Sequence, residues 1–273
     1  MSDDALLTVR DLSVHAGDTT LVAGVDLSVA RGGALGIVGE SGSGKSLTCR
    51  SVLGILPDGL HNGDDTTITF DGTDLRGLDD RGWLDVRGAR IGAVFQDPAS
   101  YLNPSIAVGR QLAEVLRVRV GLGRRAARDR ALELLDDMGL RNPALVYRQY
   151  PFELSGGMLQ RVLIAVAISA EPDLLIADEA TTALDVTVQA EVLDLLADLR
   201  ERTGLALVLV SHDLAVVAQV CDEVVVMRDG AVVERGAAAD VLDAPAHTYT
   251  RSLVDAHARY GIERFRLQGA NHG

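Results

Sequence analysis

Apolar residues recur along the chain in two patterns that predict two kinds of strand. In residues 6–14 and 21–29 apolar positions alternate with polar ones, which is typical of antiparallel strands, and residues 67–70 predict a third such strand. Short continuous apolar runs indicate instead strands that are buried on both faces of a parallel sheet. These runs cover 34–38, 90–95, 173–178 and 205–210.

Helical spacing of apolar residues separates these strands. It predicts helices over 46–56, 158–168 and 187–200. A further helical stripe ends at Gly139, a residue suited to a helix C-cap, and consists of Ala127, Ala131, Leu134, Leu135 and Met138. The pattern predicts an α/β fold with a small antiparallel β subdomain and an inserted helical subdomain.

The charge and the cysteine content of the chain indicate which kinds of partner and which compartment to expect. The 273 residues carry 26 basic and 39 acidic side chains, a net charge of −13, so we expect neither nucleic acid nor anionic lipid as a direct partner. The sequence predicts no membrane-spanning helix, and Asp3 and Asp4 do not fit the basic start of a secretory signal. Cys49 and Cys221 lack metal-site spacing and suit a reducing compartment. We therefore expect a cytoplasmic protein.

Lys45 is the only lysine of the chain, beside 25 arginines. It lies between the apolar run 34–38 and the predicted helix 46–56, in a segment that matches the phosphate-loop pattern G-x-x-x-x-G-K-S. In such a loop backbone N–H groups converge on the β-phosphate, the lysine bridges the β- and γ-phosphates, and the final hydroxyl ligates Mg²⁺. A glycine-rich turn without a ligand is the alternative. The residues expected to bind the nucleotide are Gly39, Glu40, Ser41, Gly42, Ser43, Gly44, Lys45 and Ser46.

Polar side chains follow each of the other three apolar runs. Asp178 and Glu179 end a strand that we expect to lie beside the phosphate-loop strand, where Asp178 would hold Mg²⁺ and Glu179 would orient or deprotonate the attacking water. Gln96 can both donate and accept, which suits contact with Mg²⁺ and that water. His212 is placed to contact the γ-phosphate. Taken singly, each has a structural alternative: a solvated strand end, or a histidine satisfied by its neighbours.

A second anion-binding helix start comes later in the chain. Ser155, Gly156 and Gly157 precede the predicted helix 158–168, where N–H groups and the helix dipole attract negative charge. An ordinary N-cap with flexible glycines is the alternative. Because one nucleotide already has its cradle at residues 39–46, the second cradle indicates a nucleotide held between two copies or two related chains.

These motifs, in their order and spacing, resemble those of the ATPase subunits of ABC transporters over about residues 5–262. The Leu-Ser-Gly-Gly…Gln segment at 154–160 is the most specific of them. The resemblance implies a phosphate-loop NTPase (RecA-like) core with ATP and Mg²⁺ as ligands. It also implies that Ser155–Gly157 and Asp185 act on the nucleotide bound by a partner ATPase subunit.

Two positions depart from the family pattern. Ala16 stands where family members usually stack an aromatic residue on adenine, so either the neighbouring His15 contacts the base or base stacking is weak. Ala180 replaces the usual proline after the carboxylate pair, a change that we expect to be tolerated.

The same resemblance suggests how the chain is organised. We expect a single ABC ATPase domain, with the nucleotide-binding core and the β subdomain in 1–97 and 161–245. Residues 98–160 would form the helical subdomain that carries the signature motif, and 246–273 a C-terminal tail.

Segments such as Leu53–Pro57 and Tyr150–Gln160 resemble the peptide/nickel importer group of this family, and most of all its nickel-import ATP-binding subunits. We expect an ATP-hydrolysing translocase subunit that powers uptake of nickel or a related metal chelate, dipeptide or oligopeptide. Its implied partners are a second ATPase subunit, two membrane permease subunits and an extracytoplasmic solute-binding protein, with the chain peripheral on the cytoplasmic face of the membrane.

Two other classes of function stay open beside this interpretation. The alternatives are a soluble ABC-type ATPase without a transport role and a phosphate-loop kinase, although a kinase has no use for the signature. His247, His257 and His272 lack metal-site spacing, so we interpret them as surface residues.

Overall fold

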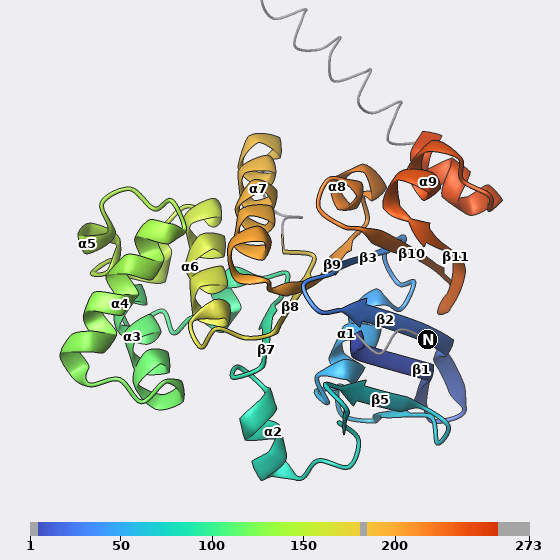
Figure 1. The fold of residues 1–273 in the computed structure, drawn as a ribbon, viewed down its shortest axis with the longest axis horizontal. Coiled ribbons are helices and arrows are strands. Elements are labelled where there is room, and N and C mark those ends of the chain that lie inside the picture. Colours follow the sequence, from blue (N-terminus) through green and yellow to red (C-terminus); the bar gives the residue numbers. More distant parts are fainter. Residues whose placement is uncertain (1–4, 181–184, 256–273) are drawn as a thin grey trace, which may run out of the picture.

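The computed structural model describes residues 5–180 and 185–255. A six-stranded sheet runs through the centre of the molecule in the order β11-β10-β3-β9-β8-β7 (Figure 1). Its strands are β3 (Ala34–Val38), β7 (Ile91–Val94), β8 (Leu174–Asp178), β9 (Ala206–Ser211), β10 (Glu223–Arg228) and β11 (Ala231–Ala237). The pairs from β10 to β7 are parallel, and β11 joins β10 in antiparallel orientation. The four predicted strands β3, β7, β8 and β9 are confirmed as a parallel sheet, whereas β10 and β11 were not predicted.

One predicted adjacency is wrong. The carboxylate strand β8 does not lie beside the phosphate-loop strand β3, because β9 lies between them. Val210 of β9 pairs with Ile37 on one side and with Asp178 on the other. All six residues of β9 are buried, and a central position gives such a strand hydrogen-bonded neighbours on both edges.

A second sheet is antiparallel, as predicted, and follows the order β2-β1-β5-β6, with β4 paired to β1. Its strands are β1 (Ala5–Ala16), β2 (Thr19–Ala30), β4 (Leu60–Asn62), β5 (Thr67–Phe70) and β6 (Thr73–Asp74). The long β1–β2 ladder contains register shifts, one of them next to Asp11, which has a left-handed backbone (φ +47°). Its amide hydrogen-bonds the side chain of Asp26 at 2.7 Å, which satisfies a backbone donor at the irregularity.

Helices cover both faces of the central sheet and form a separate group at one side. The helices are α1 (Lys45–Val52), α2 (Asp80–Val86), α3 (Val108–Arg119), α4 (Arg124–Asp137), α5 (Pro143–Val146), α6 (Gly156–Ile168), α7 (Val186–Thr203), α8 (Leu214–Ala218) and α9 (Ala238–Asp243), with 3₁₀ turns η1 (Pro98–Tyr101) and η2 (Pro151–Glu153). Figure 1 shows α3, α4, α5 and α6 gathered on the side away from the antiparallel sheet. The predicted boundary at residue 160 falls inside α6.

Alternation along β8 shows how the core is divided. Leu175 and Ala177 pack into the hydrophobic cluster formed with α6, α7 and the helical group. Leu174 and Ile176 point the other way, into the cluster formed with α1 and the antiparallel sheet. The central sheet is therefore buried on both faces, as its continuous apolar runs predict.

Two helix predictions have different outcomes. The stripe from Ala127 to Met138 is confirmed, since all five of its residues are at most 3% exposed. The helix predicted over 46–56 ends early, at Val52. Gly54 adopts a left-handed conformation (φ +61°) and a Cβ there would lie 2.5 Å from the Trp83 ring, so the chain turns at this point.

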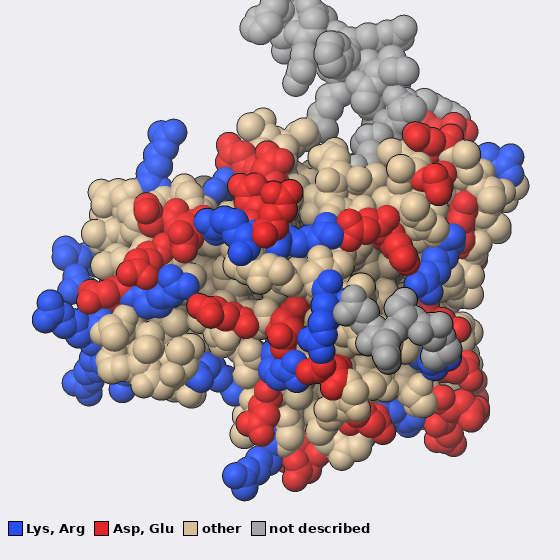
Figure 2. All heavy atoms as spheres, in the orientation of Figure 1, with Lys and Arg blue, Asp and Glu red and all other residues tan. Residues whose placement is uncertain are grey.

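Charged side chains of both signs are interspersed on the face shown in Figure 2. Several form pairs within one helix, such as Arg117 with Glu114 at 2.6 Å and Arg130 with Glu133 at 3.2 Å. Among the described helices, none is both long and apolar enough to span a bilayer.

Candidate functional site

Four neighbouring parallel strands place the predicted site residues at one edge of the central sheet. The phosphate loop follows β3, Ser211 and His212 end β9, Asp178 and Glu179 end β8, and Gln96 comes two residues after β7. Because parallel strands have their carboxyl ends at the same edge, residues distant in sequence meet there. Only the order of the strands differs from the expectation.

The phosphate loop needs glycine at several positions, for different reasons. A Cβ on Gly39 would lie 2.2 Å from the backbone oxygen of Met227, so β10 leaves no room for a side chain. Gly42 (φ +83°) has no atom within 4 Å of its missing Cβ, and its constraint is the left-handed backbone. Gly44 (φ +96°) is the N-cap of α1. The loop therefore stays wound with its amides near the start of a helix, the geometry of an anion cradle.

Lys45 is only 3% exposed and is held by the loop itself. Its Nζ donates to the carbonyl oxygens of Gly39 at 2.7 Å and Glu40 at 2.8 Å, and reaches Ser43 Oγ at 3.5 Å. Glu179 Oε1 lies 4.0 Å from the same nitrogen. Burial lowers the pKa of Lys45, while the nearby carboxylates of Glu179 and Asp178 act in the opposite direction. The loop thus holds an ammonium group through two backbone carbonyl oxygens, whose place phosphate oxygens can take.

Ser46 and Asp178 form a pair of oxygen groups next to the loop. Ser46 Oγ donates to Asp178 Oδ1 at 3.0 Å, across the width of β9. Asp178 is only 4% exposed, and burial raises its pKa, partly offset by the hydrogen bond from Ser46. A buried carboxylate beside a hydroxyl is a donor set that suits Mg²⁺, which prefers hard oxygen ligands.

Glu179 has an unusual backbone for its residue type. Its φ is +49°, and its N–H donates to Val210 O at 3.1 Å, so the chain leaves β8 in a tight turn anchored on β9. The side chain is 16% exposed and faces Lys45. A left-handed conformation at a non-glycine residue costs about 1 kcal/mol or more, and such residues cluster at functional sites. Ala180, which stands in place of the family's proline, is buried.

Gln96 and His212 reach the same edge with exposed side chains. Each is followed by a turn that a carboxylate caps: Asp97 accepts from Ala99 N at 3.2 Å, and Asp213 accepts from Val216 N at 3.3 Å. The turns position their backbones, while both side chains are exposed to solvent. Their expected contacts with Mg²⁺, water and γ-phosphate remain predictions.

The signature residues are placed at a different helix start. Ser155 is the N-cap of α6 and accepts from Met158 N at 3.3 Å, while Ser155 and Gly156 are exposed. Asp185 is the N-cap of α7 and accepts from Val188 N at 3.0 Å. The two helix starts touch, since a Cβ on Gly157 would lie 2.4 Å from Val188 Cγ1. In Figure 1, α6 and α1 lie on different sides of β7 and β8.

His15 lies on β1 in the strand pair that borders the loop. Val14 pairs with Val22, and Val22 Cγ2 would touch a Cβ on Gly44 at 3.0 Å. His15 Nδ1 lies 3.1 Å from Thr20 Oγ1, and its ring is 5.6 Å from that of His61. The expected contact of His15 with the base remains a prediction, supported by this proximity to the loop.

Sequence reasoning missed Tyr249 as a residue of this site. The N–H of Glu40 donates to its hydroxyl at 2.9 Å, across 209 positions of sequence. No local pattern signals such a contact, because it depends on where helical residues 248–255 pack.

The expectations about the remaining histidines and the cysteines have these outcomes. Within residues 5–180 and 185–255, no three His, Cys, Asp or Glu side chains form a cluster that could hold a metal. His257 and His272 lie outside the described residues. Cys49 and Cys221 are buried, and burial raises the pKa of Cys221 to about 12.

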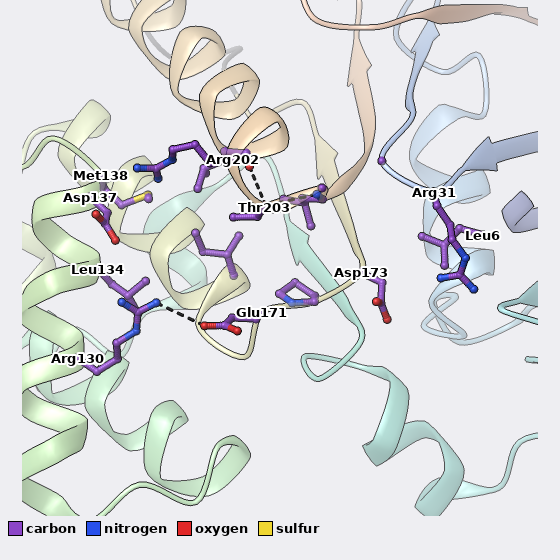
Figure 3. A pocket seen from close by; sticks show the side chains of 16 residues that line it. Leu6, Arg31, Arg130, Leu134, Asp137, Met138, Glu171, Asp173, Arg202 and Thr203 are labelled. Atoms are coloured by element: carbon purple, nitrogen blue, oxygen red, sulfur yellow. Dashed lines mark hydrogen bonds and ion pairs between the residues drawn. The ribbon is translucent and has the colours of Figure 1, made fainter. Parts of the chain in front are cut away.

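A cavity of about 550 Å³ lies at the opposite, amino end of the strands (Figure 3). Residues that precede β8 and β9, such as Asp173 and Leu205, line it together with α4. Arg130 of α4 pairs there with Glu171 at 3.6 Å. In open α/β sheets ligands bind at the carboxyl ends of the strands, so this cavity is separate from the phosphate-loop site.

The amino-acid sequence is similar to those of known ATP-binding proteins of transporters. A family model described as ABC transporter matches residues 22–182. The chain is 44% identical to a probable peptide ABC transporter ATP-binding protein of Sinorhizobium fredii, covering 93% of this chain and 77% of that protein. It is 43% identical to the dipeptide transport ATP-binding protein DppD of Escherichia coli, covering 96% and 81% respectively.

Solved structures agree with the fold. CbiO1 of Clostridium perfringens, part of an ABC transporter complex, matches with a TM-score of 0.77 and 29% identity, covering 89% of this chain and 92% of that one. A dimeric ATP-binding cassette with ADP and phosphate bound matches with a TM-score of 0.74 and 26% identity, covering 85% and 98%. The expected phosphate-loop NTPase fold is thereby confirmed. This chain belongs to the ABC transporter family, as one of its ATP-binding, ATP-hydrolysing members.

Proposed function

We propose that this chain is the ATPase subunit of an importer for dipeptides or oligopeptides. The observation that carries this proposal is that Lys45, Ser46, Asp178 and Glu179 lie together at one edge of the sheet. Lys45 Nζ lies 4.0 Å from Glu179 Oε1, and Ser46 Oγ lies 3.0 Å from Asp178 Oδ1. Relatives at 41–43% identity are named for dipeptide or oligopeptide transport, which supports this cargo and does not favour a role outside transport.

In the proposed reaction the loop amides and Lys45 bind the β- and γ-phosphates of ATP. Lys45 would exchange its bonds to the carbonyls of Gly39 and Glu40 for bonds to phosphate oxygens. Ser46, Asp178 and Gln96 would hold Mg²⁺, which neutralises phosphate charge when bound. Glu179 would orient or deprotonate the attacking water, and His212 would contact the γ-phosphate.

Hydrolysis by this chain would need a second ATPase subunit. Ser155, Gly156 and Asp185 sit at adjacent helix starts and face solvent, apart from the loop of their own chain. N–H groups at such starts attract anions, so we propose that they contact the ATP held by the partner. The dimer of the similar cassette gives precedent for two-chain assembly.

Two aromatic pairs, each with an exposed ring, support contact with membrane permeases. Phe152 is 74% exposed and stacks on Tyr150, with centroids 5.6 Å apart and planes at 9°. Tyr101, 51% exposed, stacks on Phe95 immediately beside Gln96. Exposed aromatic clusters mark interaction sites, so these pairs would receive a permease segment on the cytoplasmic face of the membrane.

The transport proposal can be tested by uptake in cells that lack the chain. We expect loss of radiolabelled dipeptide uptake, restored by the parental chain but not by Glu179→Gln. Loss of nickel uptake alone would assign the cargo to nickel, and normal uptake of both would contradict an importer of this group. Phe152→Ser, with exposed Val118→Ser as control, should lower uptake while ATP binding by the isolated chain stays unchanged.

A further inference from the structure

The first peptide of the phosphate loop is held from two sides. Its carbonyl oxygen, that of Gly39, accepts from Lys45 Nζ at 2.7 Å. Its N–H, that of Glu40, donates to the hydroxyl oxygen of Tyr249 at 2.9 Å. One peptide group therefore connects the loop lysine to a side chain near the end of the described chain.

Tyr249 is itself firmly held at this place. It is 5% exposed, and the Arg228 guanidinium at the end of β10 lies 5.0 Å from the centre of its ring. Because β10 is the parallel neighbour of β3, this arginine leaves the sheet next to the phosphate loop. The ring thus packs where the loop begins.

The start of the helical segment that carries Tyr249 is capped from β11. The Glu234 carboxylate accepts from the N–H groups of Ala246 at 2.7 Å and His247 at 3.0 Å. Burial alone would raise the pKa of Glu234, but hydrogen bonds, including these two, lower it overall. A carboxylate at a helix start is a stabilising cap, so the position of Tyr249 is set by the sheet.

We propose that Tyr249 is a positioning residue for ATP binding. Its hydroxyl sets the orientation of the Gly39–Glu40 peptide before the nucleotide arrives, and thereby the place of Lys45. A loop ordered in advance loses less entropy when it binds a ligand, and this raises affinity. The proposal rests on the proposed role of the loop in ATP binding.

A merely structural tyrosine would act differently. If Tyr249 only anchored residues 248–255, removing its hydroxyl would leave the loop unchanged. Positioning instead predicts an effect on the Glu40 amide and on ATP affinity, with little effect on overall stability.

The test compares Tyr249→Phe with Tyr147→Phe, a matched loss of hydroxyl from a partly buried tyrosine of the helical region. Hydrogen exchange in the nucleotide-free protein should show an about tenfold faster Glu40 amide in Tyr249→Phe only, the value of one hydrogen bond. The KM for ATP should rise about three- to tenfold with kcat unchanged, while the melting temperature stays near that of the parent.

Either of two results would overturn the proposal: parental exchange at Glu40 in Tyr249→Phe, or faster exchange with an unchanged KM. Failure of the proposed function has a separate signature. In that case the parental chain would bind ATP as weakly as its Lys45→Ala variant, whatever the exchange rate at Glu40.

Discussion

The chain contains two helix starts that we propose bind phosphate, and they differ in how much of the site each supplies. At α1 the loop surrounds a buried lysine, and two carboxylates stand nearby. At α6 the exposed Ser155 caps its own helix, and residues 154–160 include no basic side chain. The first site would hold an anion through the Lys45 charge and the surrounding loop together, whereas the second would contact it only through the backbone N–H groups of the helix start. A surface of the second kind becomes useful when another molecule brings the phosphate to it.

The largest expected effect follows from removing the charge of the first site. Lys45→Ala should weaken productive ATP binding and hydrolysis on the order of 10³-fold, because the phosphates lose a preorganised cation in a site with little water. Lys45→Arg should not restore activity, since a planar guanidinium does not fit among the Gly39 and Glu40 carbonyls. ATPase kinetics and fluorescent-nucleotide binding measure both variants, with exposed Arg125→Ala as control. Near-parental hydrolysis by Lys45→Arg would show that charge alone is needed.

Glu179→Gln separates binding from chemistry at the same site. The amide keeps the size of the side chain but cannot take a proton, so hydrolysis should slow by about 10²–10⁴-fold while ATP stays bound. The trapped nucleotide should then hold two ATPase subunits together. Size-exclusion chromatography with and without Mg-ATP detects this dimer, and the absence of ATP-dependent association would count against a shared nucleotide.

Ser155→Arg probes the second site. The isolated chain should bind ATP as the parent does, because the loop at 39–46 is untouched. ATPase activity of the assembled transporter should fall by about 10²-fold or more, since the added cation would occupy the γ-phosphate position across the interface. Loss of ATP binding by the isolated chain would instead place Ser155 in the nucleotide site of its own chain.

Two alanine substitutions should show smaller effects, on stability. Gly157→Ala places a methyl group 2.4 Å from Val188 Cγ1, so we expect a loss of about 1–3 kcal/mol of unfolding free energy by overpacking, relieved by adding Val188→Ala. Gly42→Ala meets no neighbouring atom and should lose about 1 kcal/mol through its left-handed backbone alone. Urea unfolding measures both. A Gly157→Ala loss that Val188→Ala fails to relieve would contradict the packing explanation.

Local patterns predicted β1, β2, β3, β5, β7, β8 and β9, because each run depends on residues close in sequence, but they did not predict β10 and β11. The order of the strands in the sheet could not be predicted from local patterns. β9 comes after β8 in the chain, yet it lies between β8 and β3. That order depends on tertiary packing, because the apolar strand β9 needs a hydrogen-bonded neighbour on each edge and helices over both of its faces. Short elements such as β4, β6 and α2 carry too few residues to show a period. The contact of Tyr249 with Glu40 depends on packing across 209 positions, beyond the reach of any local rule.

The single lysine of the chain also makes the phosphate loop a built-in probe of its own opening. A lysine-specific protease has one cleavage site in this sequence, after Lys45, and would yield two fragments, 1–45 and 46–273. Lys45 is 3% exposed and begins α1, so cleavage requires the loop to unwind locally. Under conditions in which the loop recloses faster than the protease cuts, the rate of appearance of the two fragments measures the open population of the loop. The loop can thus be followed in the unlabelled, unmodified chain, on a gel.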